Sequence, residues 1–290
     1  MARIASQSWE LFGAALVHHW STFSASLMAP YEFDAPDVDA VLRSSDGKEF
    51  RVHRLILGLA SPVFQDMFSL PQPIEPPSHI PTIDVLESSD VLEPFIQYLY
   101  PCAPPKVLDL SMWTALYIVA DKYNAEVVMD PLRDMLIPRF LTTSPLRVYA
   151  LASHWSLEEE AKIAARATLT MDISEGFPEE DARLMGSVAC QKLYLLHIQR
   201  RDQARILVNK RPYQFSDRSC ACSPTNFPAM IQALSQRLAT RPWLTAEGLY
   251  EEAAKSSNSI FCLNCRNSFK NMHTWFSSIL KDVSELPQTI

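Results

Sequence analysis

The segment from Asp39 to Phe68 carries the strongest local folding signals of the chain. Two short runs of β-branched and apolar residues, Val41–Arg43 and Phe50–Val52, are typical of β-strands. The Asp46-Gly47 pair between them favours a two-residue hairpin turn, because both central positions of such a turn need a positive φ. The segment therefore predicts an antiparallel hairpin whose alternate side chains point to opposite faces.

A change of sequence period after His53 indicates the start of helical structure. The stretch Leu55–Ala60 is nearly all apolar and predicts a short buried helix. Ser61 and Pro62 then form a second helix start, since a hydroxyl can cap the first turn and proline lacks only an N–H that has no partner there. The apolar face of this second helix is expected to consist of Val63, Phe64, Met67 and Phe68.

This order of motifs resembles the BTB/POZ domain. In that family an Asp opens the first strand, His-Arg or His-Lys ends the second, and an apolar helix precedes a Ser-x-x-Phe-x-x-Met-Phe helix. The resemblance covers residues 36–140 and implies an α+β fold, in which helices cover a small sheet. The matching positions are Asp39, His53-Arg54, Ser61–Phe68, a strand at Ile80–Val85, Leu99-Tyr100 and Ala120–Tyr123.

Composition limits the classes of function. A chain of 290 residues can form two domains, and its 48% hydrophobic and 20% charged residues are typical of a globular protein. The net charge of −7 argues against general nucleic-acid binding. No Gly-rich phosphate loop, GxSxG or HExxH motif occurs, so we expect no enzyme activity. Six cysteines without a signal peptide indicate reduced thiols in an intracellular protein, cytoplasmic or nuclear.

Residues 1–30 carry apolar side chains at every third or fourth position, which predicts an amphipathic helix. The adjacent His18 and His19 and several serines make it a poor transmembrane span, so no membrane association is expected. In many BTB domains an N-terminal helix packs across a two-fold dimer interface, and packing on its own subunit is the alternative. The apolar stripe consists of Trp9, Phe12, Leu16, Trp20, Phe23 and Leu27.

The remainder of the chain, residues 144–290, predicts an all-α extension. Ser144-Pro145 starts one helix, Glu158–Glu160 precede an alanine-rich second helix, and Ala182–Asn209 indicates a longer third. The first two resemble the BACK-like helical extension that follows many BTB domains, and we place the domain boundary near Thr142. A proline-rich stretch after the Met-Phe helix, Pro71–Pro77, is expected to be a stiff surface loop.

Two cysteine pairs in the extension are candidates for metal binding. Cys262 and Cys265 form a CxxC half-site, in which a tight turn directs two thiolates to one tetrahedral Zn²⁺, and Cys220 and Cys222 form a CxC pair. A structural four-thiolate zinc site, buried free thiols and disulfides are the three interpretations that the sequence leaves open. The tail with these pairs resembles the fungal branch of BTB proteins.

The resemblance implies a non-enzymatic interaction module that forms a homodimer and recruits other proteins. In dimeric BTB domains of transcriptional regulators, the opening Asp and the basic residue after the His line a charged pocket. Asp39 and Arg54 match these positions and, with His53, form the candidate partner-binding site. The structural alternatives are that Asp39 caps the first strand, that Arg54 is a surface charge and that His53 is a hydrogen-bonded core residue.

Two further functions remain as alternatives. Adaptors of cullin-type ubiquitin ligases often carry an apolar-x-Glu motif after the Met-Phe helix, and Pro73-Ile74-Glu75 departs from it, so a cullin scaffold is the second choice of partner. DNA-linked regulation would require an exposed basic helix face. A solvated helix face is the simpler interpretation of the basic cluster, which consists of Arg200, Arg201, Arg205, Lys210 and Arg211.

Overall fold

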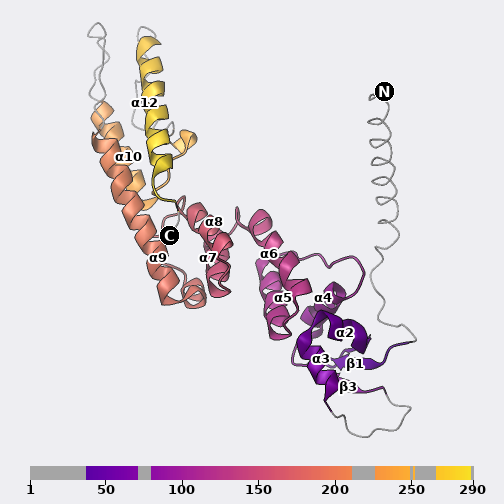
Figure 1. Cartoon of the computed structure of the whole chain (residues 1–290). Coiled ribbons are helices and arrows are strands. Elements are labelled where there is room, and N and C mark those ends of the chain that lie inside the picture. Colours follow the sequence, from indigo (N-terminus) through magenta and orange to yellow (C-terminus); the bar gives the residue numbers. More distant parts are fainter. Residues whose placement is uncertain (1–36, 71–79, 211–225, 249–250, 252–265, 289–290) are drawn as a thin grey trace, which may run out of the picture. The chain divides into compact units, whose positions relative to one another are not determined.

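The computed structural model describes residues 37–70, 80–210, 226–248, 251 and 266–288 (Figure 1). The predicted N-terminal helix at residues 1–30 and the proline-rich loop lie outside these ranges. The chain divides into two compact units, Met1–Met135 and Leu136–Ile290, with the division inside helix α6 (Glu126–Phe140).

The first unit contains a three-stranded sheet in the order β2-β1-β3. Strand β1 (Ala40–Arg43) pairs antiparallel with β2 (Glu49–Val52) and parallel with β3 (Thr82–Asp84). The central strand is buried along nearly its whole length, whereas β2 alternates between buried and exposed residues. This pattern is expected when β1 is covered on both faces and β2 is an edge strand. The predicted hairpin and third strand are confirmed.

The hairpin turn differs from the predicted two-residue type. Ser44 and Lys48 still pair through the backbone, and the N–H of Gly47 donates to the carbonyl of Ser44 at 2.9 Å. Within the turn only Gly47 has a positive φ, of 87°. This is a three-residue loop that ends in a left-handed glycine. Asp46 is thereby free to accept from the backbone N–H and hydroxyl of Ser89, at 2.7 and 2.6 Å, and so caps helix α4 (Ser89–Leu99).

The helices of the first unit begin close to the predicted positions. Ser61 caps α3 (Pro62–Ser69) by accepting from the N–H of Phe64, as predicted, and its hydroxyl donates to the carbonyl of Tyr123 at 2.5 Å. Tyr123 follows α5 (Leu110–Lys122) and stacks on Phe64 with ring centroids 4.5 Å apart. These contacts join α3 to the end of α5. The largest fully buried side chains of this unit are Trp113, Tyr117, Phe50, Phe64 and Phe95.

Helix α2 (Arg54–Ala60) is present, but the prediction that it is a buried helix is wrong. Only Leu57 is fully buried, while Leu55 and Leu59 are 71% and 80% exposed. An all-apolar segment does not indicate which side of the helix faces the core, because it has no polar positions that would mark the exposed side.

Every regular element in the described part of the second unit is a helix, as predicted for the extension. Helix α7 (Pro145–His154) packs on α8 (Glu158–Thr168) and on α9 (Glu179–Lys210). Helices α10 (Asn226–Thr240) and α12 (Arg266–Glu285) also pack on α9 (Figure 1). Gly186 interrupts α9 with φ 73° and ψ 169°, a conformation that side-chain-bearing residues rarely adopt.

Arg200 lies in the core of the second unit, so the expectation that it belongs to a solvated basic face is wrong. Its side chain is 1% exposed and donates to four backbone carbonyls, at distances of 2.6 to 2.9 Å. The guanidinium also lies 4.7 Å from the ring of Trp243. Burial, with a smaller contribution from Arg166, lowers the pKa of Arg200 to about 10, so the group stays charged at neutral pH. The carbonyls belong to Pro242, Val283, Leu286 and Pro287.

Candidate partner-binding site

The junction between β2 and α2 brings the three predicted site residues together. Asp39 precedes β1, His53 follows β2 and Arg54 is the first residue of α2. The backbone N–H of Arg54 donates to Oδ1 of Asp39 at 2.7 Å. The N-cap residue of α2, His53, makes no side-chain cap, so the carboxylate from the neighbouring strand satisfies a helix N–H that would otherwise lack a partner. Asp39 therefore caps a helix rather than its own strand.

His53 is held by hydrogen bonds on both ring nitrogens. Its Nδ1 lies 3.1 Å from the hydroxyl of Tyr100, and its Nε2 lies 3.2 Å from Oδ1 of Asp37. Because a carboxylate can only accept, Nε2 must carry a proton. The hydrogen bond from His53 holds the pKa of Asp37 below its ordinary value. The backbone N–H of His53 also donates to the Tyr100 hydroxyl at 2.8 Å. The alternative of a hydrogen-bonded core residue is thus confirmed for the hydrogen bonds but not for the burial, since the side chain is partly exposed.

The guanidinium of Arg54 packs against α3. Its central carbon lies 5.0 Å from the ring centre of Phe68, and one amino group donates to the Phe68 carbonyl at 3.5 Å. Nε of Arg54 is buried and has no hydrogen-bond partner among the residues that the structure describes. The site residues are thus engaged inside the domain. Their binding of a partner stays a prediction.

An exposed apolar stripe on α2 lies directly beside these residues. Leu55 and Leu59 are separated by four positions, so they share one face of the helix. Both are largely exposed, whereas Leu57 faces the core. The sequence alone does not reveal this feature, because nothing in the segment distinguishes inward-facing from outward-facing leucines. Exposed apolar side chains that lie together occur at protein-binding surfaces.

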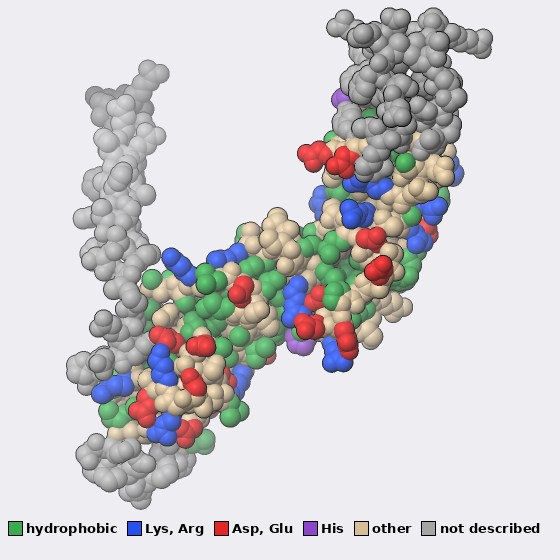
Figure 2. Space-filling view, turned by 180° about the vertical axis from the view of Figure 1, so that it is seen from behind, with side chains coloured by type: hydrophobic (Ala, Val, Ile, Leu, Met, Phe, Trp, Pro, Cys, Tyr) green, Lys and Arg blue, Asp and Glu red, His purple; other side chains and the backbone are tan. Residues whose placement is uncertain are grey.

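The basic cluster does not form one exposed surface. Arg200 is buried, Arg201 pairs with Asp202 at 2.9 Å, and Arg205 lies within 3.5 Å of the Ser235 hydroxyl. Arg211 lies outside the described residues. On the face seen in Figure 2, Lys and Arg side chains are interspersed with Asp and Glu side chains. The surface that DNA-linked regulation required, with Arg200, Arg201 and Arg205 side by side and exposed, is therefore not formed.

The four cysteines of the predicted zinc site, Cys220, Cys222, Cys262 and Cys265, lie outside the described residues. Within the described ranges, no group of three or more His, Cys, Asp or Glu side chains is placed to hold a metal ion. Cys102 and Cys190 belong to the described part and are free thiols. Zinc binding by the two pairs stays a prediction.

Native mass spectrometry of the full chain, before and after chelation, tests the zinc prediction. If the pairs bind zinc, we expect one zinc ion per chain, its loss on chelation, and a lower melting temperature for Cys262→Ser, because a metal that joins two helix starts stabilises the fold. Cys102→Ser is the matched control and should retain the metal. Metal-free protein whose melting is unaffected by Cys262→Ser would rule out a structural zinc site.

The sheet covered by helices, with its capped β2–α2 junction, defines the first unit as a small α+β domain. The family that matches is the BTB/POZ domain, over residues 33–139. Residues 33–139 of this chain are therefore a BTB/POZ domain, a protein–protein interaction module that is generally not catalytic.

The chain is similar to two known proteins. The chain is 30% identical over 122 residues to a BTB/POZ domain-containing protein of Arabidopsis thaliana, which covers 40% of this chain and 54% of the relative. The chain thus spans about half the length of the curated relative that it matches. The BTB domain of zebrafish PATZ1 is a structural neighbour, with 18% identity and a TM-score of 0.26, covering 33% of this chain and 73% of that one.

No helix in the described part is long and apolar enough to cross a membrane.

Proposed function

We propose that this chain is a non-catalytic interaction scaffold, which self-associates through its BTB/POZ domain and recruits partner proteins. The proposed layout is an N-terminal helix at residues 1–30, the BTB/POZ domain at 36–140 and the helical, BACK-like extension at 144–290. The protein acts inside the cell, in the cytoplasm or the nucleus. The coarse role follows from the domain type, and the observation that supports self-association is the apolar face of α2.

Burial of this face provides a driving force for a homodimer. Leu55 and Leu59 are 71% and 80% exposed, and burying a leucine side chain is worth about 1.5–3 kcal/mol. A symmetric dimer places the same patch of both copies at one interface, so each leucine contributes twice. Arg54, Asp39 and His53 lie at the start of the same helix, where they would border the interface.

The double substitution Leu55→Glu and Leu59→Glu is expected to convert the homodimer into a monomer. Two carboxylates per copy would have to be desolvated at the interface, and the apolar contact would be lost. Analytical ultracentrifugation of the full chain over a range of concentrations measures the change. The dissociation constant of the homodimer should rise by at least about a hundredfold.

Leu86→Glu with Leu108→Glu is the matched control, because these leucines of the same unit are 84% and 72% exposed and lie outside α2. It introduces the same charge and removes the same apolar area, and it should leave the dimer intact. A wild-type chain that is monomeric at every concentration, or a double α2 variant that still dimerises, would contradict self-association through α2.

Recruitment of a cullin scaffold remains an alternative that no observation on the described residues favours. The candidate motif, Ile74-Glu75, lies outside them. DNA-linked regulation loses its basis with the burial of Arg200.

A further inference from the structure

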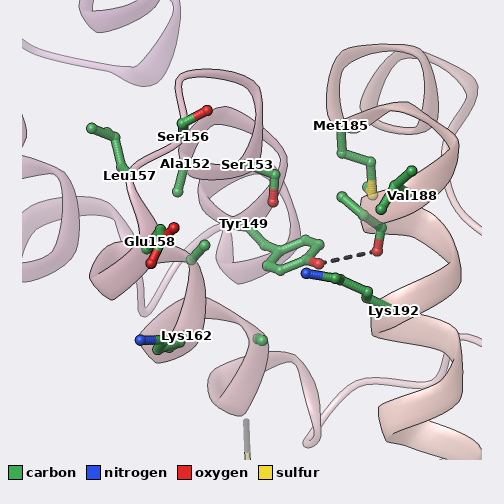
Figure 3. A pocket seen from close by; sticks show the side chains of 13 residues that line it. Tyr149, Ala152, Ser153, Ser156, Leu157, Glu158, Lys162, Met185, Val188 and Lys192 are labelled. Carbon is green, nitrogen blue, oxygen red and sulfur yellow. Dashed lines mark hydrogen bonds between the residues drawn. The ribbon is translucent and has the colours of Figure 1, made fainter. Parts of the chain in front are cut away.

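A pocket of about 390 Å³ lies in the second unit, where α7, α8 and α9 meet (Figure 3). Its size falls in the range of sites that hold small ligands or peptide side chains. Small residues leave this space open: Ala152 on α7, and Ala161 and Ala165 on α8. The interruption of α9 at Gly186 falls between Met185 and Val188, which both line the pocket.

The side chains that line the pocket are mainly apolar inside it and charged at its rim. Tyr149 lies in its centre, and the tyrosine hydroxyl donates to the carbonyl of Ala189 at 3.0 Å. Burial raises the pKa of Tyr149, so the phenol stays neutral. Glu158 and Lys162 come from α8 and Lys192 from α9, on opposite sides of Tyr149 in Figure 3.

The two lysines at the rim differ in their partners. Lys162 donates to Glu159 at 2.7 Å, so its charge is compensated within the helix. Lys192 has no hydrogen bond or ion pair with any residue in the described part of the unit. One end of the pocket therefore presents an uncompensated positive charge, and the Glu158 end presents a carboxylate.

An exposed apolar strip extends this pocket along α9. Val188 and Leu195 are 65% and 45% exposed, and Lys192 lies between them. The spacings of four and three residues place all three on one face of the helix. A pocket that continues into an apolar strip with a central cation has the form of a peptide-binding groove, in which apolar anchors give affinity and a charge fixes the register.

We propose that this groove binds a short acidic peptide segment of a partner protein. An aliphatic or aromatic side chain of the peptide enters the pocket beside Tyr149, and a neighbouring carboxylate pairs with Lys192. Backbone N–H groups of the peptide are directed to Glu158. The proposal deepens the proposed recruitment function and rests on it, since it assigns the chemistry of the recruited segment and the surface that selects it.

Binding of synthetic 12-residue peptides to the full chain tests the proposal. Three series share a central Leu or Phe and differ in flanking residues, which are Glu, Gln or Lys, and fluorescence polarisation measures each affinity. The Glu series should bind most tightly. Lys192→Glu should weaken binding of the Glu series by about tenfold or more. The same variant should bind the Lys series more tightly than the wild type does. Lys210→Glu, a matched reversal at the end of α9, should change neither series.

A pocket variant and a competitor complete the test. Ala161→Leu should block the pocket and reduce binding of every series, while circular dichroism reports whether the fold is kept. Absence of binding by all series, preference for the Lys series, or indifference to Lys192→Glu would each overturn the proposal. Equal binding of free 4-phenylbutyrate would show that the site takes a small carboxylate rather than a peptide. Sedimentation of the same variants separates these outcomes from failure of the dimer, because Lys192 and α2 belong to different units.

Discussion

Replacing Arg200 with methionine is expected to lower the free energy of unfolding of the second unit by about 3–5 kcal/mol, because four backbone carbonyls lose a charged donor and a buried polar group left without a partner costs about 1–3 kcal/mol. Three of the four carbonyls that Arg200 satisfies, those of Val283, Leu286 and Pro287, lie at the end of α12 or just after it. Carbonyls at a helix end have no intrahelical donor. Methionine keeps the apolar bulk of the side chain but removes the charged donor from these buried or partly buried carbonyls, of which that of Val283 keeps a long bond, 3.4 Å, from the N–H of Leu286.

Urea denaturation followed by circular dichroism measures this loss, and hydrogen exchange locates it at the end of α12. Arg205→Met is the matched control, because Arg205 is an exposed arginine of the same helix, with one long contact to Ser235. It should change stability little. Arg200→Lys should fall between the two, since an ammonium keeps the charge but offers three donors and no planar face for Trp243. Equal midpoints for Arg200→Met and wild type would show that the carbonyls find other donors.

The importance of Arg200 could not be predicted from the sequence. Arginines in a run of basic residues are most often solvated, and this expectation fits Arg201 and Arg205. The acceptors of Arg200 near α12 lie 83 to 87 positions further along the chain, and Pro242 lies 42 positions away. No periodicity within α9 reports such distant carbonyls. A buried arginine is found only when the packing of three segments is known.

The first unit was more predictable, because its signals are local. A few adjacent residues are enough to predict the alternation in the strands, the helix start at Ser61-Pro62 and the order of the elements. The predicted type of the hairpin turn was wrong, because Asp46 makes a contact outside the hairpin. Its carboxylate caps the N-terminus of α4. The pKa of Asp46 is lowered to about 2 by its hydrogen bonds with Ser89. Asp39 has the same kind of long-range capping role at α2.

The candidate site was predictable in position but not in detail. The motif order identified Asp39, His53 and Arg54, and the fold brings them to one junction. The motif order gave no indication that Asp37 is a partner of the His53 imidazole, or which side of α2 faces outward. Under the proposed function partner choice depends on those exposed side chains, and sequence patterns constrain exposed positions weakly because their packing is decided by another molecule.

Acidification from pH 7 to pH 4 is expected to reduce the stability of the second unit through His197. The hydroxyl of Thr168 donates to the carbonyl of Ala165 at 2.6 Å, so Nε2 of His197, 3.0 Å from that hydroxyl oxygen, must be the donor in their contact. Nδ1 is then unprotonated, buried and without a partner among the described residues. Burial, and then the charge of Arg200, lower the pKa of His197 from 6.5 to about 4.

The sign of the effect follows from proton binding. Between pH 6.5 and about 4 the unfolded chain binds a proton at His197 that the folded chain does not, so stability falls as the pH falls through this window. The shift predicts a loss of about 3 kcal/mol by pH 4, at 1.36 kcal/mol for each pKa unit. Protonation would bury a second positive charge beside Arg200, with no acceptor at Nδ1.

His197→Gln is the variant that isolates this contribution, because its amide NH₂ can still donate to Thr168 and does not titrate. The difference in unfolding free energy between wild type and His197→Gln, measured by urea denaturation at several pH values, removes the carboxylates that titrate in both. This difference should change by about 3 kcal/mol in favour of the variant between pH 7 and pH 4. His154→Gln, which replaces an exposed histidine of α7, is the control and should leave the pH profile unchanged. Parallel profiles for wild type and His197→Gln would mean that the folded state accommodates the imidazolium, which contradicts the prediction.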